Sequence, residues 1–142
     1  RIRKASFFHT CERLGLQLPA EYIKLGRYHD GSLSASLTRE LMSLPEPPTC
    51  ILYPDDFSFF GGKRALEEME LSIPEDVSAA GYDGITVGKV ISLTTVQQDT
   101  VRLGSACAEE LVKAVEEGRA YLPHNELIPC SLIKGATVKK LN

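Results

Sequence analysis

The stretch IPEDVSAAGYDG, residues 73–84, decides the fold, because it joins a short apolar run to a glycine and then to an acid. The apolar run, residues 77–80, predicts a buried strand that ends close to Asp83. In an open α/β sheet, ligands bind outside the carboxyl ends of the strands, where loops leave the sheet. Asp83 is therefore a candidate ligand acceptor, although an Asp-Gly pair also fits a turn in which the Asp bonds its own backbone.

Helix and strand signals alternate on both sides of this stretch. Helical spacing of apolar residues and suitable caps predict helices over residues 2–14, from a cap at Asp30 or Ser32 to Leu44, over residues 57–70, and from a cap at Asp99 to Gly118. Strand-like runs lie at residues 21–25, 49–53, 77–81, 93–96 and 126–133, the last as one or two short strands. This alternation predicts an α/β domain of three layers, with a mainly parallel sheet and helices on both faces.

Length and charge exclude several classes of protein. A chain of 142 residues with 43% hydrophobic side chains suits one globular domain rather than two. A net charge of -3 and the lack of a long Lys/Arg cluster argue against a nucleic-acid groove on this chain. No apolar run approaches the roughly 20 residues that a membrane span needs. We therefore expect a cytoplasmic protein with no membrane contact.

The cysteines fit that location. Cys11, Cys50, Cys107 and Cys130 lie far apart in the sequence, without the paired spacing of a zinc or redox site. Buried free thiols are the expected state in a reducing compartment. The sequence gives no reason to expect a metal or another cofactor.

Three blocks in a characteristic order resemble a known family. They are PTCILYPDDFSFFGGKRALEEMELSIPEDVSAAGYDG at residues 48–84, LTTVQQDTVRLGSACAEEL at residues 93–111, and ELIPCSLIKGAT at residues 126–137. Together they resemble the C-terminal part of lactose-repressor/galactose-repressor family transcription regulators, and the resemblance covers essentially the whole chain. It implies the C-terminal lobe of a periplasmic-binding-protein-like domain of type I. Such a two-lobed sensor binds a small molecule between its lobes and passes the signal to a separate DNA-binding head.

The resemblance also implies an effector site. By position in the family's motifs, Arg3, Tyr28, Asp83 and Gln98 are the expected contacts, with Asp55 in the place of a family Asn. A guanidinium fork suits vicinal hydroxyls or a carboxylate, and an aromatic ring suits the apolar face of a sugar or base. The expected effector is a sugar or a related metabolite. Asp55 and Asp56 also fit the N-terminal cap of the following helix better than a Mg²⁺ site or an acid/base pair.

The same resemblance predicts a homodimer. The family's dimer contact falls on the helix of residues 57–70, and the expected interface residues are Phe57, Phe59, Phe60, Lys63 and Arg64. The chain, residues 1–142, is expected to be an incomplete lobe, with residues 99–120 belonging to the opposite lobe. That helix would then carry an apolar row without its usual cover, formed by Val101, Ala108, Leu111, Val112 and Val115.

Two other classes of function share some of these features. The C-terminal lobe of a periplasmic sugar-binding protein, serving a transporter, has the same fold. An enzyme that uses the carboxylates of Asp55, Asp56 and Asp83 is a more distant alternative, and we expect no catalysis. The LTT run, the closing SLIKGAT run and the expected reduced cysteines favour the regulator.

Overall fold

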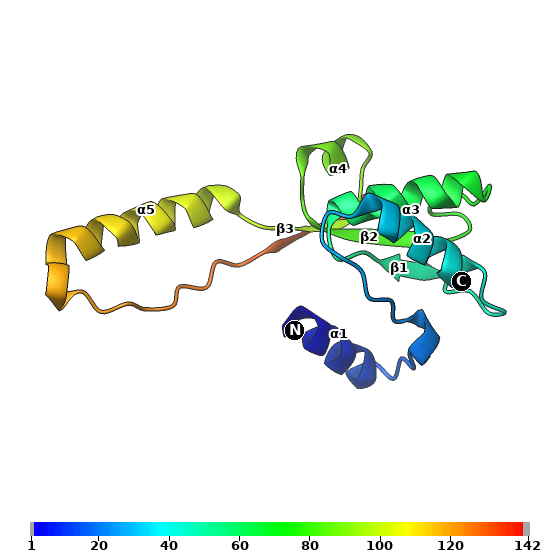
Figure 1. The fold of residues 1–142 in the computed structure, drawn as a ribbon, viewed down its shortest axis with the longest axis horizontal. Coiled ribbons are helices and arrows are strands. Elements are labelled where there is room, and N and C mark those ends of the chain that lie inside the picture. The colour runs from blue at the N-terminus through cyan, green and yellow to red at the C-terminus, as the bar shows by residue number, and fades with distance from the viewer. Residues whose placement is uncertain (1, 141–142) are drawn as a thin grey trace.

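A single mixed sheet forms the centre of the computed structural model, which describes residues 2–140 (Figure 1). Its strands are β1 (Cys50–Leu52), β2 (Ser78–Asp83), β3 (Thr95–Gln97) and β4 (Ser131–Ile133), and they lie side by side in that order. The first two pairings are parallel and the β3–β4 pairing is antiparallel. The predicted α/β fold with a mainly parallel sheet is confirmed.

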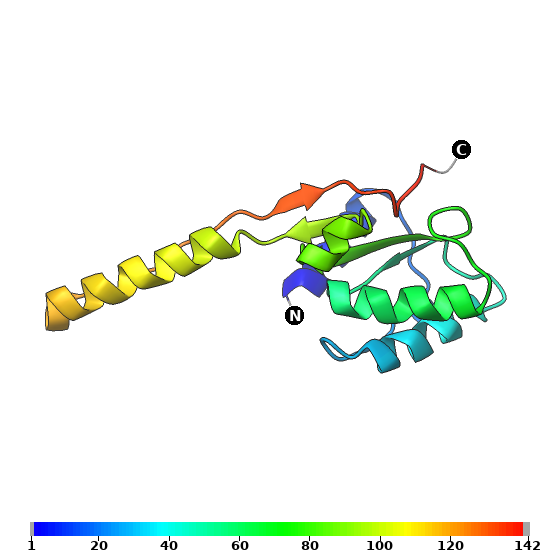
Figure 2. The same cartoon turned by 90° about the horizontal axis from the view of Figure 1, so that it is seen from above.

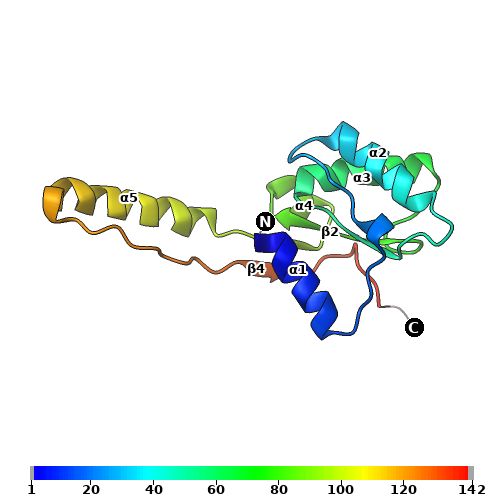
Figure 3. The ribbon, with the colours of Figure 1, turned by 60° about the horizontal axis from the view of Figure 1, so that its bottom comes forward.

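Helices lie on both sides of the sheet. The α-helices are α1 (Ile2–Arg13), α2 (Gly31–Met42), α3 (Asp56–Glu68), α4 (Thr86–Val90) and α5 (Thr100–Glu117), and short 3-10 helices occupy Ala20–Tyr22 and Gly118–Ala120. Helices α2 and α3 cover one face, whereas α1 lies on the opposite side of the sheet (Figures 1 and 3). The predicted caps are confirmed at α2 and α5, where Asp30 and Asp99 accept hydrogen bonds from Leu33 N and Arg102 N.

Glycines bring α2 and α3 into close contact. A Cβ atom on Gly61 would lie 2.1 Å from the carbonyl oxygen of Gly31, so only glycine fits there. Small residues of α3 thus allow the neighbouring helix to approach closely. The core between these helices and the sheet contains Leu41, Ile51, Tyr53, Phe59, Leu66, Val77, Ala79 and Leu93.

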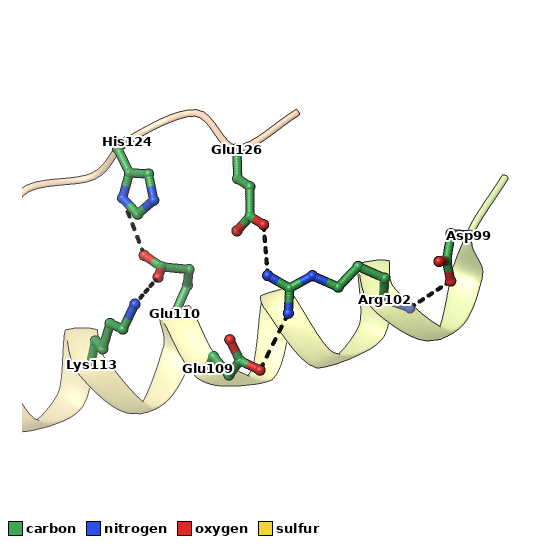
Figure 4. Close-up of polar contacts among 7 residues, drawn as sticks. All are labelled: Asp99, Arg102, Glu109, Glu110, Lys113, His124 and Glu126. Carbon is green, nitrogen blue, oxygen red and sulfur yellow. Dashed lines mark hydrogen bonds and ion pairs between the residues drawn. The ribbon is translucent and has the colours of Figure 1, made fainter. Parts of the chain in front are cut away.

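Helix α5 projects from the sheet together with the chain that returns to β4 (Figures 1 and 2). Polar contacts hold the two parts of this arm together (Figure 4). Arg102 contacts Glu126 at 2.9 Å and Glu110 contacts His124 at 3.4 Å, whereas the 2.7 Å contact of Glu110 with Lys113 lies within α5. The apolar side chains of α5 are largely exposed, namely Val101, Leu103, Leu111, Val112 and Val115.

Three expectations about local structure were wrong. Residues 21–25 form no strand, since the 3-10 helix Ala20–Tyr22 takes up the start of the run and Leu25 is 81% exposed. A strand there would need a partner beside it to satisfy its backbone groups. Helix α4 forms at residues 86–90, where neither a helix nor a strand was expected. Of the four free cysteines, only Cys11 is buried, and the other three are exposed.

Candidate functional site

The carboxyl end of β2 presents Asp83 in a fixed geometry. The side-chain amide of Gln98 donates a 2.7 Å hydrogen bond to Oδ1 of Asp83. Asp83 has a φ of 112°, which is an unfavourable backbone conformation for a residue other than glycine. Gly84 follows with a φ of 72°, and a Cβ there would lie 2.7 Å from Cβ of Gln97. The strand end is therefore strained and is held in place by the residues that follow β3.

Arg3 reaches this region from α1. Its Nη1 donates a 3.2 Å hydrogen bond to the carbonyl oxygen of Pro54, in the loop after β1, and its Nη2 donates to the hydroxyl of Tyr28. The guanidinium carbon lies 5.2 Å from the centre of the Tyr28 ring. The predicted residues Arg3 and Tyr28 thus lie together, although they belong to segments 25 residues apart in the sequence.

Tyr82 also lies against Arg3, and it was not among the residues predicted from the sequence. Its ring centre lies 4.2 Å from the guanidinium carbon of Arg3, which is closer than that of Tyr28. Its hydroxyl lies 3.8 Å from Sγ of Cys130. That hydrogen bond is the main cause that raises the pKa of Tyr82 above its ordinary value, followed by burial. The sequence carried no local signal for this role, because a strand places the side chains of neighbours such as Tyr82 and Asp83 on opposite faces.

Asp55 does not present its carboxylate at the surface. The residue is 0% exposed, and it caps α3 by accepting hydrogen bonds from Ser58 N at 2.7 Å and Ser58 Oγ at 3.1 Å. It also accepts a 3.1 Å bond from His29 N, which fixes the backbone beside Tyr28. The cap interpretation is confirmed. Direct contact between Asp55 and an effector has no support in this geometry, because donors within the protein already satisfy the carboxylate.

Asp56 is also fully buried, and it joins three elements. Its carboxylate accepts hydrogen bonds from Thr95 Oγ1 at 2.7 Å and from Ile85 N at 2.9 Å. A Cβ on Gly81 would lie 2.2 Å from Oδ1 of Asp56, so glycine is required where β2 passes the acid. The adjacent acids at the start of α3 therefore hold the strand ends in place. Among residues 2–140, no three His, Cys, Asp or Glu side chains lie in a metal-binding arrangement.

The residues expected at a dimer contact are distributed differently on α3. Phe57 is 53% exposed and stacks at a tilt on His29, with the ring centres 5.1 Å apart. Phe59 is fully buried in the core, so its assignment to the interface was wrong. Phe60 is partly buried against the same core. Lys63 and Arg64 pair with Glu67 and Glu68 on their own helix.

In the cluster of Arg3, Tyr28, Tyr82, Asp83 and Gln98, the first two residues are exposed and the other three are partly exposed. The larger of two hollows elsewhere in the molecule has a volume of about 460 Å³ and is lined by residues of α4, β3 and β4 and the segment after β4. The other, of about 430 Å³, lies at the C-terminal end of α1. Neither is lined by a residue of the cluster. The cluster offers cationic donors, an anionic acceptor and aromatic rings, which together suit a polyhydroxylated ligand.

The chain matches one protein family over almost its whole length. Residues 1–138 match the family described as periplasmic binding protein-like domain. The ribose operon repressor of Escherichia coli (strain K12) is 27% identical over 139 residues, which cover 96% of this chain and 42% of the repressor. The chain thus spans less than half the length of that relative.

Solved structures of transcription regulators superpose on this chain. A putative transcriptional regulator LacI from Bacillus cereus subsp. cytotoxis NVH 391-98 superposes with a TM-score of 0.90 at 29% identity, over 99% of this chain and 50% of the other. The lac repressor dimer bound to operator and the anti-inducer ONPF superposes with a TM-score of 0.83 at 28% identity, over 97% of this chain and 47% of the other. Within residues 2–140, no helix is both long enough and apolar enough to span a membrane.

Proposed function

Since this chain belongs to the periplasmic binding protein-like domain family, and its relatives are repressors of the LacI type, we propose that it is the effector-sensing part of a DNA-binding transcription regulator. The observation that carries the proposal is the cluster at the carboxyl end of β2. There, Arg3 from α1 meets Tyr28, while Gln98 holds the carboxylate of Asp83. This is the edge of a parallel sheet at which ligands of α/β proteins bind.

The proposed effector is a sugar or a related polyol. Asp83 would accept hydrogen bonds from its hydroxyl groups, and Arg3 would donate to them. Tyr28, a residue that is 62% exposed, would cover an apolar face of the sugar. Asp55 would contribute indirectly, because it caps α3 and holds the backbone of His29 beside Tyr28.

The proposed assembly is a homodimer that contacts DNA only through a separate head domain. A similar structure is described as a dimer bound to operator, which supports this assembly. Phe57, with Lys63 and Arg64 on the same helix, supplies the exposed part of the proposed contact. Residues 99–120 are proposed to belong to the opposite lobe, which agrees with the exposed apolar side chains of α5.

Two alternatives receive less support. A transporter's sugar-binding protein shares the fold, but the relatives named above are repressors and regulators. An enzyme would use the carboxylates of Asp55, Asp56 and Asp83, but the first two are buried with donors within the protein and Gln98 donates to the third. We therefore propose no catalytic role. A regulator of this kind would act in the cytoplasm, where its DNA is.

The proposed function can be tested with the full-length protein and its own promoter DNA. Fluorescence anisotropy of labelled promoter DNA would be measured with and without each member of a panel of monosaccharides and disaccharides. At least one sugar should change the affinity for DNA by about fivefold or more, which is the usual size of coupling between two sites. DNA binding that no sugar changes would contradict a sugar-sensing role, and a protein without DNA binding would contradict the regulator.

A further inference from the structure

Tyr82 holds a place in the effector site that no motif of the sequence assigned to it. The Arg3 guanidinium carbon lies 4.2 Å from the centre of the Tyr82 ring and 5.2 Å from the centre of the Tyr28 ring. Both distances are within the range in which the face of an aromatic ring attracts a cation. Arg3 therefore has an aromatic neighbour from β2 and another from the segment before α2.

We infer that Tyr82 is a positioning residue of the effector site, which sets the orientation of the Arg3 guanidinium toward the ligand. This inference rests on the proposed function, and it adds a residue that determines how that site recognises hydroxyl or carboxylate groups. Among the described residues, Arg3 has two hydrogen-bond acceptors, Pro54 O and Tyr28 Oη. Of the five N–H donors of a guanidinium, three remain to bind an effector.

The ring of Tyr82 is itself held from two directions. Its backbone belongs to β2 and pairs with Val96 of β3, so the strand fixes its Cα. Its hydroxyl contacts the Cys130 thiol at 3.8 Å, close to the start of β4. A ring fixed at both ends is rigid, and a rigid neighbour lowers the entropy that the long Arg3 side chain loses when a ligand binds.

The inference separates the role of the ring from the role of the hydroxyl. Tyr82→Phe keeps the ring, so Arg3 should stay in place. Tyr82→Leu keeps a side chain of moderate size but removes the π-face, so the guanidinium should become mobile and more accessible. Cys130→Ser keeps a hydrogen-bonding group opposite the Tyr82 hydroxyl and should resemble the wild type.

Modification of Arg3 by phenylglyoxal, followed by peptide mass spectrometry, tests the inference in the full-length protein without any ligand. Arg3 should react about threefold to tenfold faster in Tyr82→Leu than in the wild type, and at the wild-type rate in Tyr82→Phe. Arg64, on α3, is the internal control, because general loosening of the fold would raise its rate as well. An unchanged Arg3 rate in Tyr82→Leu, or an equal increase at Arg64, would overturn the inference.

A second readout links the position of Arg3 to binding. For whichever sugar of the panel binds the wild type, the dissociation constant should rise about fivefold to tenfold in Tyr82→Leu and less than twofold in Tyr82→Phe. In Arg3→Lys, adding Tyr82→Leu should have little further effect, because the guanidinium through which the ring acts is gone. If no sugar binds, the proposed function fails while the labelling result still decides the role of Tyr82. Equal affinities of Tyr82→Leu and the wild type for the sugar would show that the Tyr82 ring does not contribute to effector binding.

Discussion

Gln98 donates a 2.7 Å hydrogen bond to the carboxylate of Asp83, and this contact joins the loop after β3 to the end of β2. Asp83 pairs with Gln97 in the parallel register of the two strands, so the backbone places Gln98 close to Asp83. Asp83 keeps an unfavourable φ of 112° in this arrangement. Strain of this kind persists only where surrounding contacts hold it, and it is common at ligand sites.

The turn after Asp83 should not tolerate a side chain. Gly84→Ala should lower the free energy of unfolding by about 2 kcal/mol or more, because a Cβ would contact Gln97 and the positive φ disfavours alanine. Gly104→Ala is the matched control, since a Cβ there meets nothing within 4 Å. That change in α5 should be neutral or stabilising by up to about 1 kcal/mol. Urea denaturation would compare them, and equal effects of the two substitutions would contradict the account of the turn.

Asp55 should behave as a structural residue. Asp55→Ala removes the acceptor for Ser58 N, Ser58 Oγ and His29 N in a fully buried place, so it should cost about 3 kcal/mol of stability. Asp99→Ala removes the exposed cap of α5 and should cost about 1 kcal/mol or less. Denaturation midpoints would show the difference. A stable Asp55→Ala protein that had lost effector binding alone would instead support the direct contact implied by the family resemblance.

Tyr53 makes stability depend on pH in the alkaline range. Burial raises the pKa of Tyr53 from 10.0 to about 12, against a smaller opposing effect of its hydrogen bond with Thr38. Because the folded state holds the proton more tightly, this contribution is present below pH 10 and is lost as the pH rises through 12. The loss should approach about 2 to 3 kcal/mol.

Tyr53→Phe isolates that contribution. The variant should be somewhat less stable at neutral pH, because the buried Thr38 hydroxyl loses a partner, but its stability should fall less between pH 10 and pH 12. Urea denaturation at several alkaline pH values would measure how the free energy of unfolding changes with pH in the variant and in the wild type. If stability fell equally with pH in Tyr53→Phe and in the wild type, Tyr53 would not be the source of the alkaline loss.

The proposed dimer should depend on the exposed part of α3. Phe57→Glu places a charge where Phe57 is 53% exposed, and it should shift a micromolar sample from dimer to monomer in light scattering. Ser36→Glu, on the exposed side of α2, is the control and should leave the mass unchanged. A monomeric wild type, or a dimer that survives Phe57→Glu, would remove α3 from the interface.

The sequence predicted most of the elements because their signals are local. The caps at Asp30, Asp55 and Asp99 each accept a hydrogen bond from the N–H group three residues later, so their spacing was visible in the sequence. Helix α4 was missed because it has only five residues and contains β-branched side chains and a glycine, which weaken any helix signal.

Contacts between distant segments were harder to predict. Phe57 and Phe59 were expected together at an interface, but Phe57 is exposed and Phe59 is buried, because the close packing on Gly31 sets the rotation of the helix. Tyr82 was missed since its role depends on Arg3, which is far away in sequence and comes near only when α1 lies against the strand ends. Strand pattern alone does not say which side chain meets a residue from another segment.

Calorimetric titration of the full-length protein with the sugar panel, repeated on Asp83→Ala and on Gln98→Ala, tests the central claim most directly. The account predicts that a sugar that binds the wild type loses about 2 kcal/mol or more of affinity in Asp83→Ala, because hydroxyl donors of the sugar lose their acceptor. Gln98→Ala should cost about 1 kcal/mol, because Asp83 keeps its charge but loses the hydrogen bond that orients it. A sugar that binds Asp83→Ala as tightly as the wild type would contradict the placement of the effector site at the end of β2.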